Sequence, residues 1–289
     1  MNILLTGASG FLGQRLAETL YSNSDFVMTA AVRRTLKITA SKIVIVSGLD
    51  AEVDWTIALN SQDVVVHAAA RAHIMKDEVD DPLAEYRRIN VAGTINLARQ
   101  AAAAGVKRFI YISSIKVNGE KTPVGHPFTA DDIPAPEDAY GISKWEAERG
   151  LLSIAAETNM EFVIVRPPLI YGPGVKGNFA SMNKLVKKGL PLPFGAIYNQ
   201  RSLVSLDNLV DLITTCIAHP AAANQVFLAG DGHDLSTTEL LRGVSLAMGK
   251  PCWLVPVPSS MLMLVASLLG KKDVAQRLLG SLQVDISNA

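Results

Sequence analysis

Residues 6–13 are Thr6-Gly7-Ala8-Ser9-Gly10-Phe11-Leu12-Gly13, and this stretch decides the expected fold. A β-rich run, residues 2–6, leads into it, and an apolar helical run, residues 11–21, continues from it. Residues without a side chain let the backbone turn tightly and let a pyrophosphate come close to it. The free N–H groups and partial positive charge at the start of a helix then favour the anion. The stretch therefore predicts a dinucleotide-binding turn between the first strand and the first helix.

Outward from this turn, β-rich and helical runs alternate over the first 170 residues. The apolar runs do not alternate with polar residues, which is typical of strands covered on both faces. Strand, helix and strand in repetition favour right-handed crossovers and a parallel sheet. We therefore expect an α/β fold with a Rossmann-type doubly wound parallel sheet. The expected strands lie at residues 2–6, 26–32, 42–46, 63–66, 108–112 and 162–165, and the expected helices at residues 11–21, 82–104, 139–157, 208–218 and 237–248.

The character of the chain changes near Tyr171. Glycine and proline crowd residues 172–195, which indicates loops that shape a binding cleft. We therefore expect residues 1–170 to form the NAD(P)-binding domain. Residues 171–289 are expected to form a smaller, loop-rich substrate-binding region that is interleaved with the first domain in space.

The composition is that of an ordinary soluble enzyme, with 49% hydrophobic and 19% charged residues. Lys and Arg number 27, as do Asp and Glu, so nothing indicates a polybasic surface for nucleic acid or an anionic membrane. Cys216 and Cys252 cannot form a disulfide framework, and residues 1–5 lack the basic start of a signal peptide. The most apolar stretch, residues 261–269, is too short to span a bilayer and is expected to form a core or interface helix, with a membrane contact as the less favoured alternative. These features predict a cytoplasmic protein with no nucleic-acid partner and no integral membrane segment.

Further motifs follow the glycine turn in a fixed order. Together they resemble the extended short-chain dehydrogenase/reductase superfamily, in its nucleotide-sugar epimerase/dehydratase branch, over nearly the whole chain. The resemblance implies a nicotinamide dinucleotide and a nucleotide-diphosphate sugar as partners, and it allows a homodimer. The motifs are Thr6-Gly7-Ala8-Ser9-Gly10-Phe11-Leu12-Gly13, His67-Ala68-Ala69-Ala70, Asn90-Val91-Ala92-Gly93-Thr94, Ser113-Ser114, Tyr140-Gly141-Ile142-Ser143-Lys144, Arg166-Pro167 and Tyr171-Gly172-Pro173. The residues that it assigns to the cofactor are Gly7, Ser9, Gly10, Phe11, Leu12, Gly13, Ala68, Ala69, Asn90, Tyr140 and Lys144.

Tyr140 and Lys144 are four residues apart in a helical run, so both side chains lie on one helix face. From spacing alone they could equally be a surface pair. A phenol titrates near 10, and a nearby ammonium together with a positive nicotinamide ring would favour the phenolate. Tyr140 could then exchange a proton with a substrate oxygen while hydride moves at the sugar carbon. The resemblance implies that Ser114 hydrogen-bonds the same oxygen, that Ser113 points elsewhere, and that these three residues are catalytic.

Residue types that other reactions would require are missing from this sequence. The dehydratases of the family carry an Asp-Glu pair directly after the serine, and this chain has Ile115 and Lys116 there, which argues against a dehydratase. The five histidines are scattered, so no metal site is expected. We interpret His67, at a strand end, as a packed backbone partner near the cofactor and not as an acid or base.

The second expected strand ends in Arg33-Arg34 with no acidic residue nearby. Relatives that prefer NAD place Asp or Glu there to bind the ribose 2′-hydroxyl, and that carboxylate would repel a 2′-phosphate. Two guanidinium groups would instead hold the 2′-phosphate. We therefore favour NADP(H), with NAD(H) and a solvated basic turn as alternatives. The resemblance also brings Asp50 near the adenine, although the usual Gly-Asp pair is Gly48-Leu49-Asp50 here.

The resemblance assigns Asn178, Phe179 and Arg201 to the substrate, with the Asn amide on the nucleotide and the Arg on its diphosphate. The alternative for Arg201 is a surface residue paired with a carboxylate. A short strand is expected at residues 203–206, followed by Asp207 as the N-cap of the next helix. Many members of the family continue further, so a truncated C-terminus or a missing substrate-domain element is expected.

Three functions remain open at this point. The favoured one is an NAD(P)-dependent reductase that acts at C4 of a UDP-4-keto-6-deoxy sugar in surface-polysaccharide synthesis. The alternative is a UDP-glucose or UDP-N-acetylhexosamine 4-epimerase, which uses the same groups but must retain its cofactor. A remote alternative is a non-catalytic NADP sensor, although such a protein would be expected to lose the Tyr/Lys pair.

Overall fold

The computed structural model describes residues 1–35, 37–71, 79–175 and 177–289. At the centre of this part lies a seven-stranded sheet in which all pairings are parallel. Its strand order is β3-β2-β1-β4-β5-β6-β9, so the direction of winding reverses between β1 and β4. The strands are β1 Asn2–Thr6, β2 Val27–Val32, β3 Lys42–Ile45, β4 Val64–His67, β5 Arg108–Ile112, β6 Glu161–Arg166 and β9 Gln225–Leu228.

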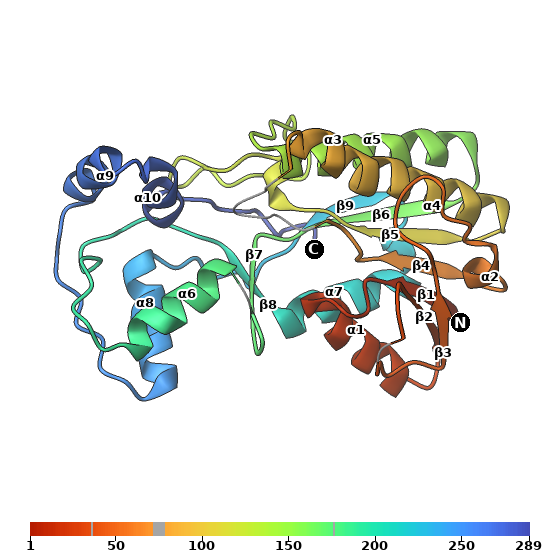
Figure 1. The fold of residues 1–289 in the computed structure, drawn as a ribbon, viewed down its shortest axis with the longest axis horizontal. Helices are drawn as coiled ribbons and strands as arrows, with labels where there is room; N and C mark the ends of the chain where they lie inside the picture. The colour runs from red at the N-terminus through yellow and green to blue at the C-terminus, as the bar shows by residue number, and fades with distance from the viewer. Residues whose placement is uncertain (36, 72–78, 176) are drawn as a thin grey trace.

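Helices cover both faces of this sheet, and they form the outer layers in Figure 1. Successive residues of β1 serve opposite faces: Leu5 packs in one core cluster with Leu16, and Leu4 packs in the other with Leu97. This explains the continuous apolar pattern of the strands, and the predicted fold class is confirmed. One face is covered by α1 Phe11–Ser22 and α7 Leu206–Ala218, and the other by α4 Gly93–Ala103 and α5 Ala139–Glu157, with the short α2 Thr56–Leu59 and α3 Pro82–Tyr86.

The predicted helix over residues 82–104 is not one regular helix. A π-helical segment, η1 Arg87–Ala92, separates α3 from α4. At the start of α4, a Cβ atom on Gly93 would lie 1.6 Å from the Leu49 carbonyl oxygen, so only glycine allows this approach. Periodicity finds the helical run, but it does not show the wider turn inside it.

The start of α7 corrects a second prediction. Asp207 is not the N-cap: Ser205 holds that place, and its hydroxyl accepts a hydrogen bond from the Asn208 N–H at 3.1 Å. Asp207 lies in the first helical turn and accepts a bond from Arg15 Nε at 2.8 Å. Serine is as good an N-cap as aspartate, so two adjacent candidates cannot be separated by residue type.

The C-terminal part of the chain contributes to two structures. Strand β9 and helix α7 belong to the large sheet and its cover, although both lie beyond residue 170. A second parallel pair, β7 Leu169–Tyr171 with β8 Leu203–Ser205, leads to a smaller helical lobe on the left of Figure 1. The division at residue 170 stays a prediction. The helices of the lobe are α6 Gly177–Lys187, α8 Thr237–Met248, α9 Ser259–Leu268 and α10 Lys272–Leu279, and the 3-10 turns of the chain are η2 Ile115–Val117 and η3 Pro220–Ala222.

Helix α9 contains most of the apolar stretch that was expected to be a core or interface helix. The core interpretation is wrong, because none of its ten residues is buried. Three of its residues, Leu262, Met263 and Ala266, are half-buried, and the others are exposed. Among the helices in the described ranges, none is both long and apolar enough to cross a membrane.

A buried ion pair joins α5 to the sheet. Arg166, at the end of β6, donates from Nη2 to Glu148 Oε2 at 2.6 Å and from Nε to Oε1 at 3.1 Å. Both side chains are almost fully buried, with 4% and 1% exposed. Ser113 donates to the same carboxylate, and Arg166 Nη1 donates to Asn118 Oδ1 at 3.0 Å. One charge pair therefore fixes α5, β6 and the segment after β5 together.

Replacing Glu148 with Gln is expected to lower the free energy of unfolding by about 3–5 kcal/mol, because the buried Arg166 loses the one carboxylate that pairs with it among the described residues. Urea denaturation of the purified variant measures this loss. Glu146→Gln is the matched control: Glu146 lies on the same helix and binds Arg87, but Arg87 is half exposed, so a loss below about 1 kcal/mol is expected. Equal losses in the two variants would contradict the structural role given to Glu148.

Candidate active site

The glycine turn between β1 and α1 lies against the loop after β4. Gly7 has a φ of +78°, and a Cβ atom there would be 2.6 Å from Ala69 N. A Cβ atom on Gly13 would be 2.0 Å from Gly7 O, so the first turn of α1 also needs glycine. No side chain caps the start of α1 in the described part of the chain. The structure thus brings the two predicted cofactor segments, residues 7–13 and Ala68-Ala69, to one place.

His67, at the end of β4, contacts the strand before this turn and helix α4. It is buried, with Nδ1 2.7 Å from Thr6 Oγ1 and Nε2 3.0 Å from Thr94 Oγ1. Burial, with a smaller effect from the charge of Lys144, lowers the pKa of His67 to about 3. The imidazole is therefore neutral and links β1, β4 and α4. Its partners are side-chain hydroxyls and not the backbone groups that the sequence suggested.

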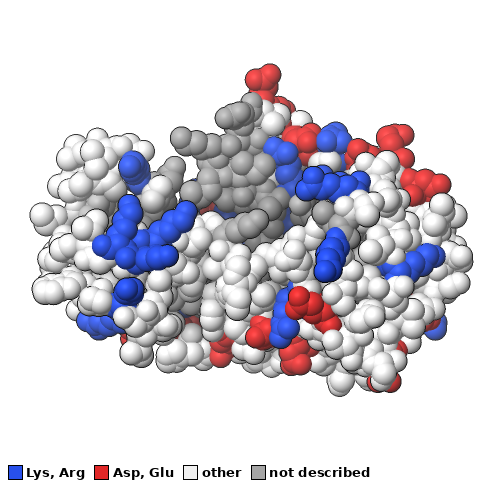
Figure 2. Space-filling model, turned by 60° about the horizontal axis from the view of Figure 1, so that its bottom comes forward, with Lys and Arg blue, Asp and Glu red and all other residues white. Residues whose placement is uncertain are grey.

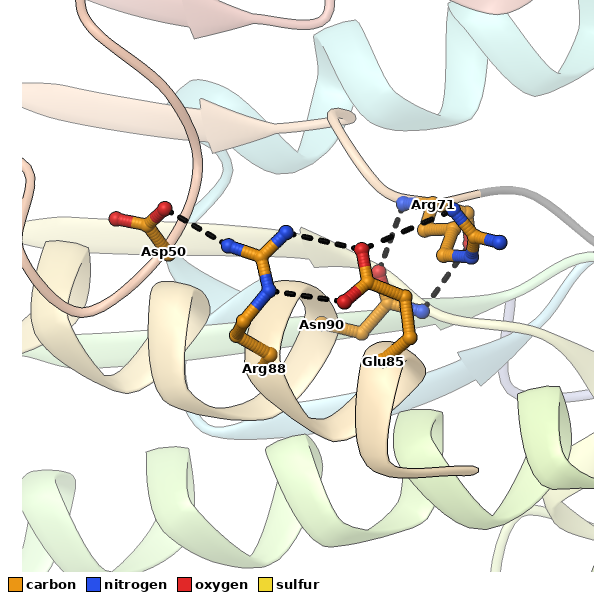
Figure 3. Close-up of polar contacts among 5 residues, drawn as sticks. All are labelled: Asp50, Arg71, Glu85, Arg88 and Asn90. Carbon is orange, nitrogen blue, oxygen red and sulfur yellow. Dashed lines mark hydrogen bonds and ion pairs between the residues drawn. The ribbon is translucent and has the colours of Figure 1, made fainter. Parts of the chain in front are cut away.

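Asn90 holds the backbone just after the same loop. It is buried, its Oδ1 accepts from Arg71 N at 2.8 Å, and its Nδ2 donates to Arg71 O at 3.1 Å (Figure 3). Nδ2 also donates to Ser143 Oγ at 3.1 Å, which ties the loop to α5. Both ends of the amide are used by the protein, so Asn90 would serve a cofactor mainly by positioning residues 68–71.

A cavity of about 430 Å³ opens beside the ends of β2 and β3. Arg33 and Asp50 both line it, whereas Arg34 does not. Neither arginine has an ion-pair partner in the described part of the chain. The lining residues are Arg33, Ser47, Gly48, Leu49, Asp50, Ala70, Arg71, Glu85, Arg88 and Ile89.

A chain of alternating charges forms one wall of this cavity (Figure 3). Arg88 donates to both oxygens of Glu85 at 2.9 Å and to Asp50 Oδ2 at 2.9 Å. Oε1 of Glu85 also lies 3.9 Å from Arg71 Nη1. Asp50 lines the cavity, and its carboxylate is held by Arg88, which the sequence analysis did not single out; its assignment to the adenine stays a prediction. The (i, i+3) spacing of Glu85 and Arg88 was the only available signal.

Three residues were predicted to be catalytic. Ser114 follows the carboxyl end of β5, and Tyr140 and Lys144 lie near the start of α5. Asp138 caps α5 by accepting from Gly141 N at 2.7 Å, which starts the helix just before Tyr140. Lys144 Nζ donates to Ile112 O at 2.8 Å and lies 5.9 Å from the centre of the Tyr140 ring. The predicted shared helix face is therefore observed.

The two serines after β5 diverge. Ser113 is buried against Glu148, as expected for the serine that points elsewhere. Ser114 is half-buried and begins the short 3-10 turn, with its Oγ accepting from Lys116 N at 3.3 Å. Its hydroxyl proton has no acceptor among the described residues, which suits a donor to a substrate oxygen.

Burial shifts the pKa values of both members of the pair. It lowers the pKa of Lys144 to about 7, with Glu148 opposing the shift. Burial, Asp138 and Tyr86 raise the pKa of Tyr140, and the lowered value expected beside a bound nicotinamide stays a prediction. The ammonium of Lys144 is bonded to Ile112 O and not to the phenol, so these side chains alone do not favour the phenolate. A further positive charge beside the ring is required to do so.

The predicted substrate residues are placed less directly. Phe179 is 9% exposed and stacks on Tyr171 with 5.9 Å between ring centres, so it is mainly part of the lobe's core. The side chain of Asn178 lies outside the described residues. Both assignments stay predictions.

Arg201 lies between the sheet and the lobe. Its Nη1 donates to Arg277 O at 2.7 Å and to Gly280 O at 3.1 Å, at the carboxyl end of α10. Burial lowers its pKa, and no carboxylate in the described residues pairs with it. The alternative of a surface arginine paired with a carboxylate is therefore wrong. A half-buried cation without a counter-ion suits an anionic ligand.

Comparison with known proteins is consistent with this site. Residues 3–230 match the family model described as the NAD dependent epimerase/dehydratase family. The chain belongs to this family. It is 54% identical over 288 residues to a UDP-glucose 4-epimerase of Vibrio cholerae, an alignment that covers 99% of this chain and 88% of that protein.

Solved structures of the family share the fold at low identity. A UDP-N-acetylglucosamine 4-epimerase from Bacillus cereus has a TM-score of 0.80 at 20% identity, and covers 100% of this chain and 91% of its own. A UDP-glucuronic acid 4-epimerase from Bacillus cereus in complex with NAD has a TM-score of 0.76 at 21% identity, and covers 100% of this chain and 90% of its own.

These findings confirm the resemblance to extended short-chain dehydrogenases and the expectation of an enzyme. They also help to choose between the epimerase and the ketoreductase reactions. The 54% identity to a UDP-glucose 4-epimerase favours the epimerase, which was the alternative, over the ketoreductase, which was the favoured function. The shared Tyr/Lys pair carries no information on this choice, because both reactions move a hydride at C4.

Proposed function

We propose that this protein is a UDP-hexose 4-epimerase that uses a retained nicotinamide dinucleotide. The observation that carries the proposal is the 54% identity to a UDP-glucose 4-epimerase over 99% of the chain. The geometry of Ser114, Tyr140 and Lys144 supports it, because an epimerase and a reductase need the same three groups at the reacting carbon. Surface-polysaccharide synthesis stays a proposed context for the product.

The residues present fit a dinucleotide. Gly7 and Gly13 let the turn pack closely, because a Cβ atom on Gly7 would meet Ala69 N and one on Gly13 would meet Gly7 O. The start of α1 has no side-chain cap among the described residues, so its backbone N–H groups suit a pyrophosphate. The family structure that contains NAD has the same fold, which supports this placement.

A bound nicotinamide would supply the hydride acceptor and donor for C4 of the sugar. Tyr140 would take the proton of the C4 hydroxyl when C4 is oxidised and return it when the ketone is reduced. Ser114 would donate a hydrogen bond to the same oxygen and hold it near Tyr140. Lys144, with its pKa near 7, adds positive charge beside the phenol only in its protonated fraction.

The epimerase is expected to interconvert UDP-glucose and UDP-galactose without net oxidation of cofactor. Sugar-nucleotide analysis by NMR measures the interconversion, and absorbance at the nicotinamide band measures cofactor turnover. Stoichiometric loss of NADPH with a UDP-4-keto-6-deoxy sugar, and no interconversion, would support the reductase instead.

Tyr140→Phe should lower turnover at least about a hundredfold while cofactor content is unchanged, because one proton transfer is lost. Tyr86→Phe removes a neighbouring phenol, 6.0 Å away between ring centres, and should stay within a few-fold of wild type.

We further infer that the ends of β2 and β3 favour a dinucleotide with a 2′-phosphate. Arg33 lines the cavity there without an ion-pair partner in the described chain, and Arg34 follows it. NADPH is expected to bind more tightly than NADH, and Arg33→Glu with Arg34→Glu to abolish the difference, because the guanidinium groups are replaced by carboxylates. Calorimetric titration of both dinucleotides checks this. A tenfold preference of the wild type for NADH would refute this inference and leave the epimerase proposal standing.

Arg201 is proposed to bind the diphosphate of the sugar nucleotide. Arg201→Ala should raise KM roughly tenfold to a hundredfold and change kcat much less, because the diphosphate is remote from C4 and keeps its charge. Asn199→Ala is the matched control: Asn199 Nδ2 also donates to Gly280 O, at 2.8 Å, but the side chain carries no charge. If both variants lose stability equally and neither changes KM, Arg201 only anchors α10.

A further inference from the structure

Helix α9 exposes a stripe of large apolar side chains. Met261, Leu264, Val265 and Leu268 recur at the spacing of one helix face, and they are 57%, 63%, 47% and 79% exposed. Leu269, 67% exposed, extends the stripe past the helix end. The sequence of α9, residues 259–268, contains no charged residue. We call these five side chains the apolar tip; they lie on the lobe at the far left of Figure 1.

The lobe around the apolar tip is basic. The whole chain has equal numbers of acidic and basic residues, but residues 177–200 and 236–280, which contain α6, α8, α9 and α10, hold eight Lys or Arg and two Asp or Glu. Lys271 and Lys272 are exposed and follow the tip directly. Figure 2 shows Lys and Arg gathered over this end of the molecule, on a surface otherwise white, and most Asp and Glu elsewhere. The zero net charge therefore conceals an asymmetry that composition does not show.

An apolar stripe bordered by lysines fits an anionic lipid surface. A helix of this kind can lie in the interface plane with its apolar side chains below the headgroups, while the lysines that follow it, Lys271 and Lys272, stay beside the phosphates. Ten residues are about half of what a bilayer-spanning helix needs, so α9 is long enough to lie on a membrane but not to cross it. Trp253, 67% exposed on the segment that leads into α9, is a residue type favoured at that depth.

A second copy of the chain fits this surface less well. Five such side chains offer roughly 300–600 Å² of apolar area, whereas a stable interface takes about 800 Å² from each partner. A two-fold symmetric contact would also bring the same basic surface of both copies together, and like charges repel. Anionic lipid requires no minimum area and neutralises the lysines.

We propose that the apolar tip docks this enzyme on the surface of an anionic membrane. Leu264 and Leu268 provide the inserted side chains, and Lys271 and Lys272 provide the electrostatic attraction. The proposal goes beyond the epimerase reaction, since none of these residues is assigned to the cofactor or the sugar nucleotide.

Co-sedimentation with vesicles tests the proposal. The wild-type protein should bind vesicles made of equal parts phosphatidylcholine and phosphatidylglycerol, and bind pure phosphatidylcholine much less. Leu264→Ser with Leu268→Ser should reduce the bound fraction at least about tenfold through lost insertion. Lys271→Glu with Lys272→Glu should do the same through lost attraction. Tryptophan emission should shift to shorter wavelength with the mixed vesicles, and Trp253→Phe should remove that shift.

The matched control is Ile57→Ser with Ile133→Ser. These side chains are 71% and 89% exposed on other parts of the molecule, so the control removes similar apolar surface elsewhere and should bind vesicles like the wild type. Failure of the wild type to bind the mixed vesicles overturns the proposal, as does equal binding by all variants. A wild-type dimer that does not bind vesicles and that Leu264→Ser with Leu268→Ser converts to a monomer also overturns it, in favour of a second copy.

Discussion

The buried charge of Glu148 is the constraint on which the catalytic part of the structure depends. It lies on the same face of α5 as Lys144 and Tyr140, at four and eight residues from them. Arg166 and Ser113 bind its carboxylate from β6 and from the end of β5. A carboxylate this deeply buried must keep those partners, so the helix that carries Tyr140 cannot rotate or slide without leaving a charge unpaired. The ion pair thereby fixes the register of the catalytic helix against the strand ends.

The Glu148 carboxylate also affects the pKa of Lys144. Burial alone would strongly favour the neutral form of Lys144, and Glu148 opposes it, which leaves the pKa of this lysine near 7. Burial, and after it Asp138 and Tyr86, raise the pKa of the Tyr140 phenol. A positive charge beside the ring would oppose this shift and favour the phenolate.

Much of the fold could be predicted because its signals are local. The bounds of α5 and the parallel order of strands follow from periodicity and from the caps and turns that delimit them. The site was predictable where one residue type is required, as at Gly7 and Gly13, where a Cβ atom would meet backbone. The resemblance to a family added Ser114, which spacing alone does not identify.

The rest depended on what lies beside each residue in space. Nothing near Arg88 in the sequence indicates Asp50, which is 38 residues away and yet 2.9 Å from it. The apolar run at residues 261–269 could not reveal whether it is covered, because a core helix and an exposed helix with the same composition have the same sequence pattern. The partner of Lys144 could not be predicted for a similar reason: the lysine has the predicted spacing from Tyr140, but its ammonium donates to Ile112 O.

The choice between epimerase and reductase illustrates a limit of another kind. Both reactions use a proton donor and acceptor at one oxygen and a hydride at one carbon, so Ser114, Tyr140 and Lys144 would be the same in either. The reactions differ in how long the dinucleotide remains bound, which is a property of the whole cleft. Here the wall at Asp50 is made of pairs that are a quarter to a half exposed, so each contributes little to stability and can exchange partners easily. The charged wall is therefore a weak basis for retaining a cofactor, whereas the turn at Gly7 and Gly13 is closely packed, since a Cβ atom on either residue would meet backbone.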